Sequence, residues 1–123
     1  MRAVKSKDTA PEMIVRRLVF SLGYRYRLHG AKLPGKPDLF FASRKKAIFV
    51  HGCFWHGHDC RRGDRQPKAN AEYWREKIGR NRARDLSNVA KLEAAGWSVL
   101  VVWECEIRDN DRLAAVLRSF LAS

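Results

Sequence analysis

The chain has 123 residues, which is enough for one domain with a hydrophobic core and too few for two. Lys and Arg outnumber Asp and Glu by 25 to 13, and the resulting net charge of +12 points to a polyanionic partner such as nucleic acid. The sequence has no apolar run of membrane-spanning length and no secretory signal, so we expect a cytoplasmic protein that has no membrane partner.

The positive charge is concentrated in two segments. Residues 1–37 carry nine Lys and Arg against two acids, and residues 61–84 carry nine against three, whereas residues 85–123 carry four against six. The excess of positive charge could simply form a solvated surface. A basic helix that lies on a membrane surface fits less well, because it would confine the charge to one amphipathic segment. Its concentration in two separate segments favours a face that binds nucleic acid.

Hydrophobic periodicity predicts alternating helices and strands. Thr9-Ala10-Pro11-Glu12 has the pattern of a capping box that starts the first helix, and Gly23 would end it. The apolar run at 97–103 has the pattern of a strand buried on both faces. The predicted elements, in chain order, are a helix at 10–22, strands at 24–28, 39–41 and 47–51, a helix at 70–95, a strand at 97–103 and a helix around 113–121.

This order of elements predicts an α/β fold in a single domain over 1–123, with a mixed central sheet flanked by helices. The strand at 97–103 should lie parallel to the strand at 47–51, because a crossover helix joins them.

A segment rich in Cys and His follows the third strand. Cys53, His58 and Cys60 have the spacing C-x4-H-x-C, and Cys105 is the one further cysteine. Cys53 and Cys105 each lie two residues beyond a predicted strand, so parallel strands would bring both thiols to one edge of the sheet. Three Cys and one His complete a tetrahedral shell, which favours structural zinc over idle buried cysteines or an open catalytic zinc site.

An acidic residue and a histidine are predicted to meet at the same edge. The hairpin turn is centred within residues 44–45, so we expect Asp38 to oppose His51 and Leu39 to oppose Val50.

Metal-assisted cleavage of a phosphodiester needs a carboxylate for Mg²⁺, a base that prepares water, and a group that stabilises the leaving oxygen. Asp38, His56 and His51 have the chemistry for these parts. Each also has a structural alternative: a turn residue for Asp38, and a zinc-loop or core histidine for the other two. Glu12 fits its capping box equally well.

Four blocks of the sequence resemble the very short patch repair (Vsr) family of mismatch endonucleases. In order and spacing they span most of residues 2–106. They are residues 33–38 (LPGKPD), 49–60 (FVHGCFWHGHDC), 73–81 (YWREKIGRN) and 96–105 (GWSVLVVWEC).

The resemblance implies a restriction-endonuclease-like fold with a structural zinc. It implies an Mg²⁺-dependent nickase that cuts the T-containing strand 5′ to the T of a T:G mismatch, the product of 5-methylcytosine deamination. The substrate would be double-stranded DNA in the bacterial nucleoid. Mismatch-repair proteins are candidate partners, and we expect a monomer.

The resemblance also implies roles by position. Asp38 would bind Mg²⁺, His56 would position or deprotonate the attacking water, and His51 and Glu12 would organise metal-bound waters and the phosphate. Family members often have Thr where this chain has Val50. If this position binds the metal through its main-chain carbonyl, Val in place of Thr has no effect. If it binds through the Thr hydroxyl, Val removes that ligand.

The structural zinc would be held by Cys53, His58, Cys60 and Cys105. Aromatic side chains of the same region would contact DNA.

Phe54, Trp55 and Trp74 would insert beside the mismatch, where stacking is weakened, although Trp74 fits a core position equally well. Arg61 and Arg62 would grip the backbone. Two alternatives remain open: a Vsr-like nuclease with another DNA target, and a non-catalytic zinc DNA-binding module, which would not need Asp38.

Overall fold

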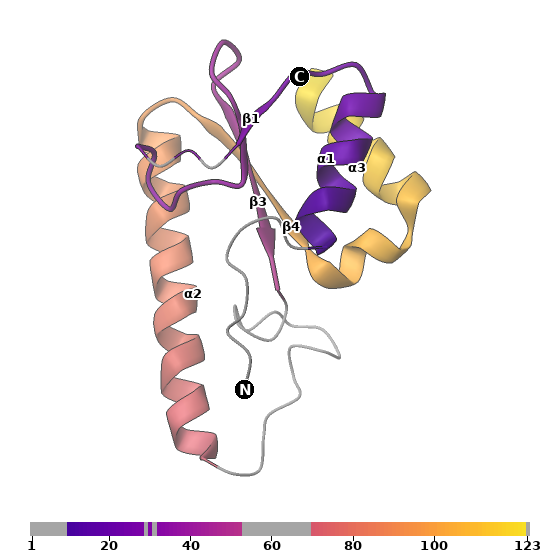
Figure 1. Cartoon of the computed structure of the whole chain (residues 1–123). Coiled ribbons are helices and arrows are strands. Elements are labelled where there is room, and N and C mark those ends of the chain that lie inside the picture. The colour runs from indigo at the N-terminus through magenta and orange to yellow at the C-terminus, as the bar shows by residue number, and fades with distance from the viewer. Residues whose placement is uncertain (1–9, 29, 31, 53–69, 123) are drawn as a thin grey trace.

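A computed structural model describes residues 10–28, 30, 32–52 and 70–122. Within these ranges a central sheet lies between α2 on one face and α1 with α3 on the other (Figure 1), which confirms the predicted order of helices and strands. The elements are α1 (Ala10–Ser21), β1 (Arg27–Leu28), β2 (Leu39–Phe41), β3 (Lys46–His51), α2 (Ala71–Ala94), β4 (Ser98–Trp103), the 3-10 helix η1 (Glu104–Arg108) and α3 (Asn110–Ala122).

The sheet has the strand order β1-β2-β3-β4. β2 is antiparallel to both β1 and β3, while β3 and β4 are parallel, as the crossover helix predicted. His51 pairs with Trp103, so β3 and β4 end side by side. We call this end of the sheet the carboxyl edge.

The β2–β3 hairpin has a different register from the predicted one. Leu39 pairs with Ile48 instead of Val50, so the prediction that Asp38 directly opposes His51 is wrong. The difference is two residues, and therefore each side chain of β2 keeps its face of the sheet.

Contacts with the last turn of α3 are compatible with this register and stabilise it. The Lys46 ammonium donates to the Phe120 carbonyl at 2.5 Å, and the Arg44 guanidinium donates to the Leu121 carbonyl at 3.2 Å. Cations are stabilised beside the carbonyl end of a helix. Lys46 is thereby buried as the first residue of β3, and Lys45, with φ 52, takes the left-handed position of the turn.

The two outer strands are less extensive than predicted. β1 holds only Arg27 and Leu28 of the expected strand at 24–28, although the tyrosines there are half-buried and the arginines exposed as predicted. The last strand packs against a core on each face, as predicted, with Leu100 and Val102 on one face and Val99 and Val101 on the other, although most of these side chains are only half-buried. β4 is an edge strand of the described sheet, and Val102 is its one buried residue. An apolar run does not distinguish an edge strand from a central one.

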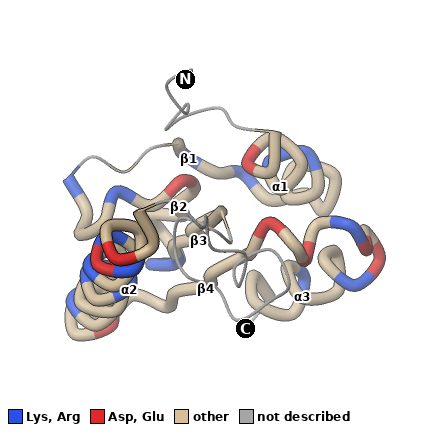
Figure 2. Tube along the Cα trace, turned by 90° about the horizontal axis from the view of Figure 1, so that it is seen from below, with Lys and Arg blue, Asp and Glu red and all other residues tan. Residues whose placement is uncertain are grey.

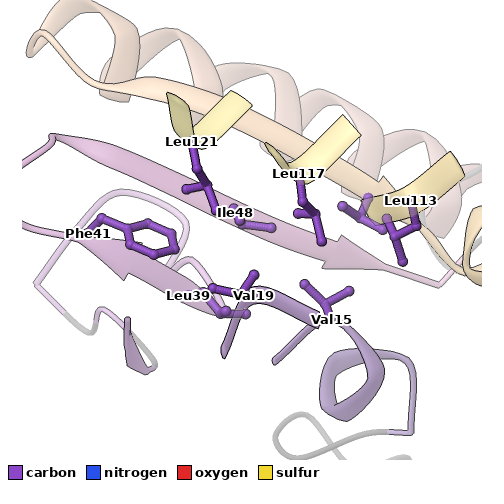
Figure 3. Packing of buried hydrophobic residues seen from close by; sticks show 9 residues of the cluster. Val15, Val19, Leu39, Phe41, Ile48, Leu113, Leu117 and Leu121 are labelled. Atoms are coloured by element: carbon purple, nitrogen blue, oxygen red, sulfur yellow. The ribbon is translucent and has the colours of Figure 1, made fainter. Parts of the chain in front are cut away.

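The main core lies between the sheet and the pair α1 and α3. In Figure 3, leucines of α3 point onto Ile48 from one side, and valines of α1 approach Leu39 from the other. Its buried members are Val15, Val19, Leu39, Phe41, Ile48, Val102, Leu113, Leu117 and Leu121.

A smaller core lies under α2 on the opposite face. Its buried members are Ala47, Phe49 and Leu92, with Trp97 and Val99 among the half-buried residues around them. α2 has 24 residues and buries only Ile78 and Leu92, which leaves most of its surface exposed to solvent. In the described part of the chain, no helix combines the length and apolar character needed to cross a bilayer.

Candidate active site

A tight turn introduces Asp38 at the start of β2. The amide of Lys36 donates to the carbonyl of Leu33 at 3.0 Å, and Gly35 between them has φ 76, as expected at the third position of a type II turn. Pro37 follows with its side chain fully buried. The hydrogen-bonded turn and the buried Pro37 therefore fix the backbone that leads into Asp38.

The carboxylate of Asp38 binds the main chain of β3. Its Oδ2 accepts a hydrogen bond of 2.7 Å from the amide of Val50. Burial raises the pKa of Asp38 to about 7, and the hydrogen bond and negative charge of Glu12 act in the same direction. The Val50 amide and the Arg16 guanidinium oppose this rise in pKa because both favour the ionised carboxylate.

Glu12 is delivered to the same place by α1. Its side chain is 1% exposed and forms an ion pair with Arg16, one helical turn further along. A buried carboxylate requires such a partner, because the loss of hydration is otherwise too costly. The structure thus brings together Glu12 and Asp38, two of the predicted site residues. Thr9, the other member of the predicted capping box, lies outside the described residues.

His51 occupies the end of β3, next to the residue that binds Asp38. It is buried, and its ring lies 5.2 Å from that of Trp103 and 5.6 Å from that of Phe49. Phe49 belongs to the core under α2, whereas Val50 packs with the core under α1 and α3. The carboxyl edge therefore joins groups from both faces of the sheet.

The Asp38–Glu12 pair is chemically suited to a divalent cation. Two adjacent carboxylates repel each other when both are ionised, and a cation between them would offset this repulsion. Mg²⁺ is commonly bound by one or two carboxylates together with water and phosphate oxygens. No group of three or more His, Cys, Asp or Glu is arranged for a metal among the described residues. Water and phosphate oxygens of the substrate are suited to complete the coordination.

Most of the predicted zinc and DNA-contacting residues lie outside the described residues. They are Cys53, Phe54, Trp55, His56, His58, Cys60, Arg61 and Arg62.

Cys105 is the described member of the predicted zinc set, and it is half-buried in η1 directly after β4. The Glu106 carboxylate accepts a hydrogen bond of 2.7 Å from the amide of Trp103, which ties η1 to the end of the strand. The pairing of His51 with Trp103 means that the strands preceding Cys53 and Cys105 end at the same edge.

Trp74 lies near the start of α2 in a small aromatic and cationic group. Its ring is 5.2 Å from that of Tyr73, and the Lys77 ammonium lies 5.7 Å from Trp74 and 5.9 Å from Tyr73. Tyr73 is 53% exposed. Trp74 is half-buried, and among the described residues it does not belong to either hydrophobic core. This position favours a surface role over a core role.

Sequence reasoning missed Arg16 and the use of the Val50 amide. Arg16 stands four residues after Glu12, a spacing that pairs side chains on one helix face, and this signal was available. The Val50 contact depends on the hairpin register and had no local signal.

Comparison with known proteins gives a consistent set of relatives. A family model described as DNA mismatch endonuclease Vsr matches residues 1–62. The type II nicking enzyme V.XorIIP of Xanthomonas oryzae pv. oryzae is 54% identical over 121 residues, which are 98% of this chain and 88% of that protein.

Two further relatives are more distant. The type II nicking enzyme V.NmeAIP of Neisseria meningitidis is 45% identical over 89% of this chain and 78% of its own length. The DNA mismatch endonuclease Vsr of Escherichia coli is 42% identical over 92% of this chain and 72% of its own length.

Proposed function

This chain belongs to the Vsr family of DNA endonucleases, and we propose that it nicks the T-containing strand of a T:G mismatch, 5′ to the T, in an Mg²⁺-dependent reaction. The observation that carries the proposal is the pairing of Asp38 with Glu12 beside the carboxyl edge. The Escherichia coli relative bears the name of a mismatch endonuclease, and the Xanthomonas relative that of a nicking enzyme, which supports both parts of the proposal.

Asp38 and Glu12 are the residues proposed to hold Mg²⁺. When bound, the ion would neutralise charge on the scissile phosphate and lower the pKa of a bound water. Asp38 would give up its proton on binding, and the Val50 amide would keep its carboxylate in place. We assign the Val50 contribution to its main-chain carbonyl, because its side chain packs with the main core.

The histidines have separate proposed parts. His56 would position or deprotonate the attacking water, and His51 would organise metal-bound water and the phosphate. The position of His51 at the end of β3, next to Val50, supports its part. Its burial between rings limits its movement.

We propose that the aromatic residues Phe54, Trp55 and Trp74 enter the duplex beside the mismatch, while Arg61 and Arg62 contact the backbone. The neighbours of Trp74 at the start of α2 support this assignment. Its ring lies beside the ring of the exposed Tyr73 and beside the Lys77 ammonium. Stacking of a base on an aromatic ring contributes roughly 1–3 kcal/mol.

The structural zinc is proposed to be bound by Cys53, His58, Cys60 and Cys105. Purified protein should contain about one zinc per chain, since one tetrahedral shell can be built. Cys105→Ser should lower both the zinc content and the melting temperature, because the binding energy of a structural metal contributes to folding. A metal-free protein that melts like the zinc-loaded one would refute this site.

The decisive experiment measures strand cleavage in matched and T:G duplexes, with the two strands labelled separately and Mg²⁺ present or absent. We expect cleavage of the T-containing strand alone, in the T:G duplex alone, and only with Mg²⁺. Asp38→Asn should bind the duplex but cut it roughly 100- to 10,000-fold more slowly, as after loss of a catalytic group. Asp111→Asn, an exposed change on α3, is the matched control.

Each other outcome selects an alternative. Equal cleavage of both duplexes would indicate a Vsr-like nuclease with another target. Mismatch binding without cleavage by wild-type protein would indicate a zinc DNA-binding module.

A further inference from the structure

A pair of exposed cations lies on the second half of α2. Arg84 and Lys91 are seven residues apart, which places them two turns apart on one side of the helix. Positions three and four residues from each of them hold no acidic residue. These cations therefore lack the intrahelical acidic neighbours that would offset their charge.

The turn before β2 packs beside these two cations. A Cβ atom on Gly35 would lie 2.9 Å from the Cβ of Asn88, which is four residues after Arg84 and three before Lys91. The turn carries two exposed lysines of its own, Lys32 and Lys36.

We call Lys32, Lys36, Arg84 and Lys91 together the basic ridge. In Figure 2, Lys and Arg of the turn and of α2 lie on the same side of the sheet. Within the described part of the chain, no member of the basic ridge takes part in a salt bridge.

We propose that the basic ridge binds backbone phosphates of duplex DNA that flanks the cleavage site. This inference rests on the proposed function, since it takes the endonuclease substrate as the ligand. Lys36 lies two residues before Asp38, at the end of a hydrogen-bonded turn. A phosphate bound at Lys36 would therefore lie close to the carboxylate pair. α2 runs in the direction opposite to β3 and passes the carboxyl edge (Figure 1), and Lys91 lies in its last turn, so contacts made by the ridge would extend along flanking DNA.

The proposal predicts a dependence on DNA length. A duplex of about one helical turn centred on the mismatch would reach Lys36 but end before Lys91 at the far end of the ridge, whereas one of about three turns would cover the whole ridge. Each phosphate contact releases counterions and adds about 0.9 to the slope of log affinity against log salt. An acidic protein partner at the ridge would give no such length dependence.

The test compares Arg84→Gln/Lys91→Gln with Arg112→Gln/Arg118→Gln, which removes the same charge from exposed positions of α3. Both pairs are made in full-length Asp38→Asn protein. Affinity is measured across a salt series on short and long duplexes, each in matched and T:G form. The ridge pair should weaken long-duplex binding about 10-fold or more, lower the salt slope on the long duplex by about 2, and weaken short-duplex binding much less. The α3 pair should change neither.

Equal effects of the ridge pair on both lengths, or no effect on the long duplex, would overturn the proposal. Melting temperatures should match those of the parent, because all four changed side chains are exposed. The ridge effect is expected on matched and T:G duplexes alike. Loss of mismatch preference alone would therefore count against the proposed function and leave the ridge intact.

Discussion

The two faces of the sheet differ in how they are built. α3 has 13 residues and buries Leu113, Leu117 and Leu121, whereas α2 has 24 residues and buries only two. The face under α1 and α3 carries the main core, and α1 also supplies Glu12. The face under α2 carries a small core and the basic ridge.

If the basic ridge binds DNA as proposed, this difference separates stability from DNA contact. A helix that buries few side chains has a large surface that can carry charge without disturbing the core. The candidate active site lies at the carboxyl edge, where residues of both faces meet. We therefore expect substitutions on the α1 and α3 face to affect folding and chemistry, and those on the α2 face to affect binding.

The largest effect tests the unequal cores. Leu117→Ala should lower the free energy of unfolding by about 3–5 kcal/mol, because a filled core cannot close the resulting cavity. Leu92→Ala should cost less, about 2–3 kcal/mol, because the core around Leu92 is smaller and can relax. Urea denaturation measures both. An equal or greater cost at Leu92 would remove the distinction between the two faces.

The next effect concerns α1 as a source of chemistry. Glu12→Gln should slow nicking roughly 100-fold or more, since it removes one charge of the carboxylate pair while keeping its size. Binding of the duplex should persist, because the cations on α2 are unchanged. Single-turnover cleavage and affinity are the measurements, and Arg17→Gln on the exposed side of α1 is the control. Normal cleavage by Glu12→Gln would remove this residue from the site.

The raised pKa of Asp38 predicts how activity depends on pH. At limiting Mg²⁺, nicking should increase about 10-fold per pH unit and level off near pH 7, because the ionised carboxylate binds the cation. More Mg²⁺ should move this midpoint to lower pH, since cation and proton compete. A midpoint that does not move with Mg²⁺ would contradict the assignment.

The same pKa predicts stability without divalent cations. The folded protein holds a proton on Asp38 that the unfolded chain has lost above its ordinary pKa of 3.8. This contribution is present below pH 3.8 and is lost as the pH rises through about 7. Thermal melting should therefore show a fall across this window that Asp38→Asn abolishes. Mg²⁺ should raise the wild-type melting temperature more at pH 8 than at pH 5.

The smallest effect tests how the turn is held against α2. Gly35→Ala should cost about 1–3 kcal/mol, because it combines φ 76 with a 2.9 Å approach to Asn88. Gly79→Ala within α2 meets nothing within 4 Å and should stabilise the protein by roughly 0.5–1 kcal/mol. Thermal melting distinguishes these opposite signs. Tolerance of Gly35→Ala would show that the turn is not tightly packed on the helix.

The sequence by itself determined which elements form and in what order. Periodicity of apolar residues is a local property, so it located the three α-helices and the strands of the described sheet. The crossover helix fixed β3 and β4 as parallel, since a strand joined through a helix returns in the same direction. The order and spacing of four motif blocks were sufficient to indicate the family, which the relatives then showed.

Only the tertiary structure decided the hairpin register, the edge position of β4 and the neighbours of Asp38. Lys46 pairs with Phe41 and Ser98 in the sheet, and its ammonium reaches the Phe120 carbonyl, 74 residues away in the sequence. Asp38 meets Glu12 because α1 packs against β3 and η1, and no local pattern encodes that meeting. Periodicity indicates which side chains are buried, whereas a site depends on which distant segments pack together. Long-range contacts determine that packing.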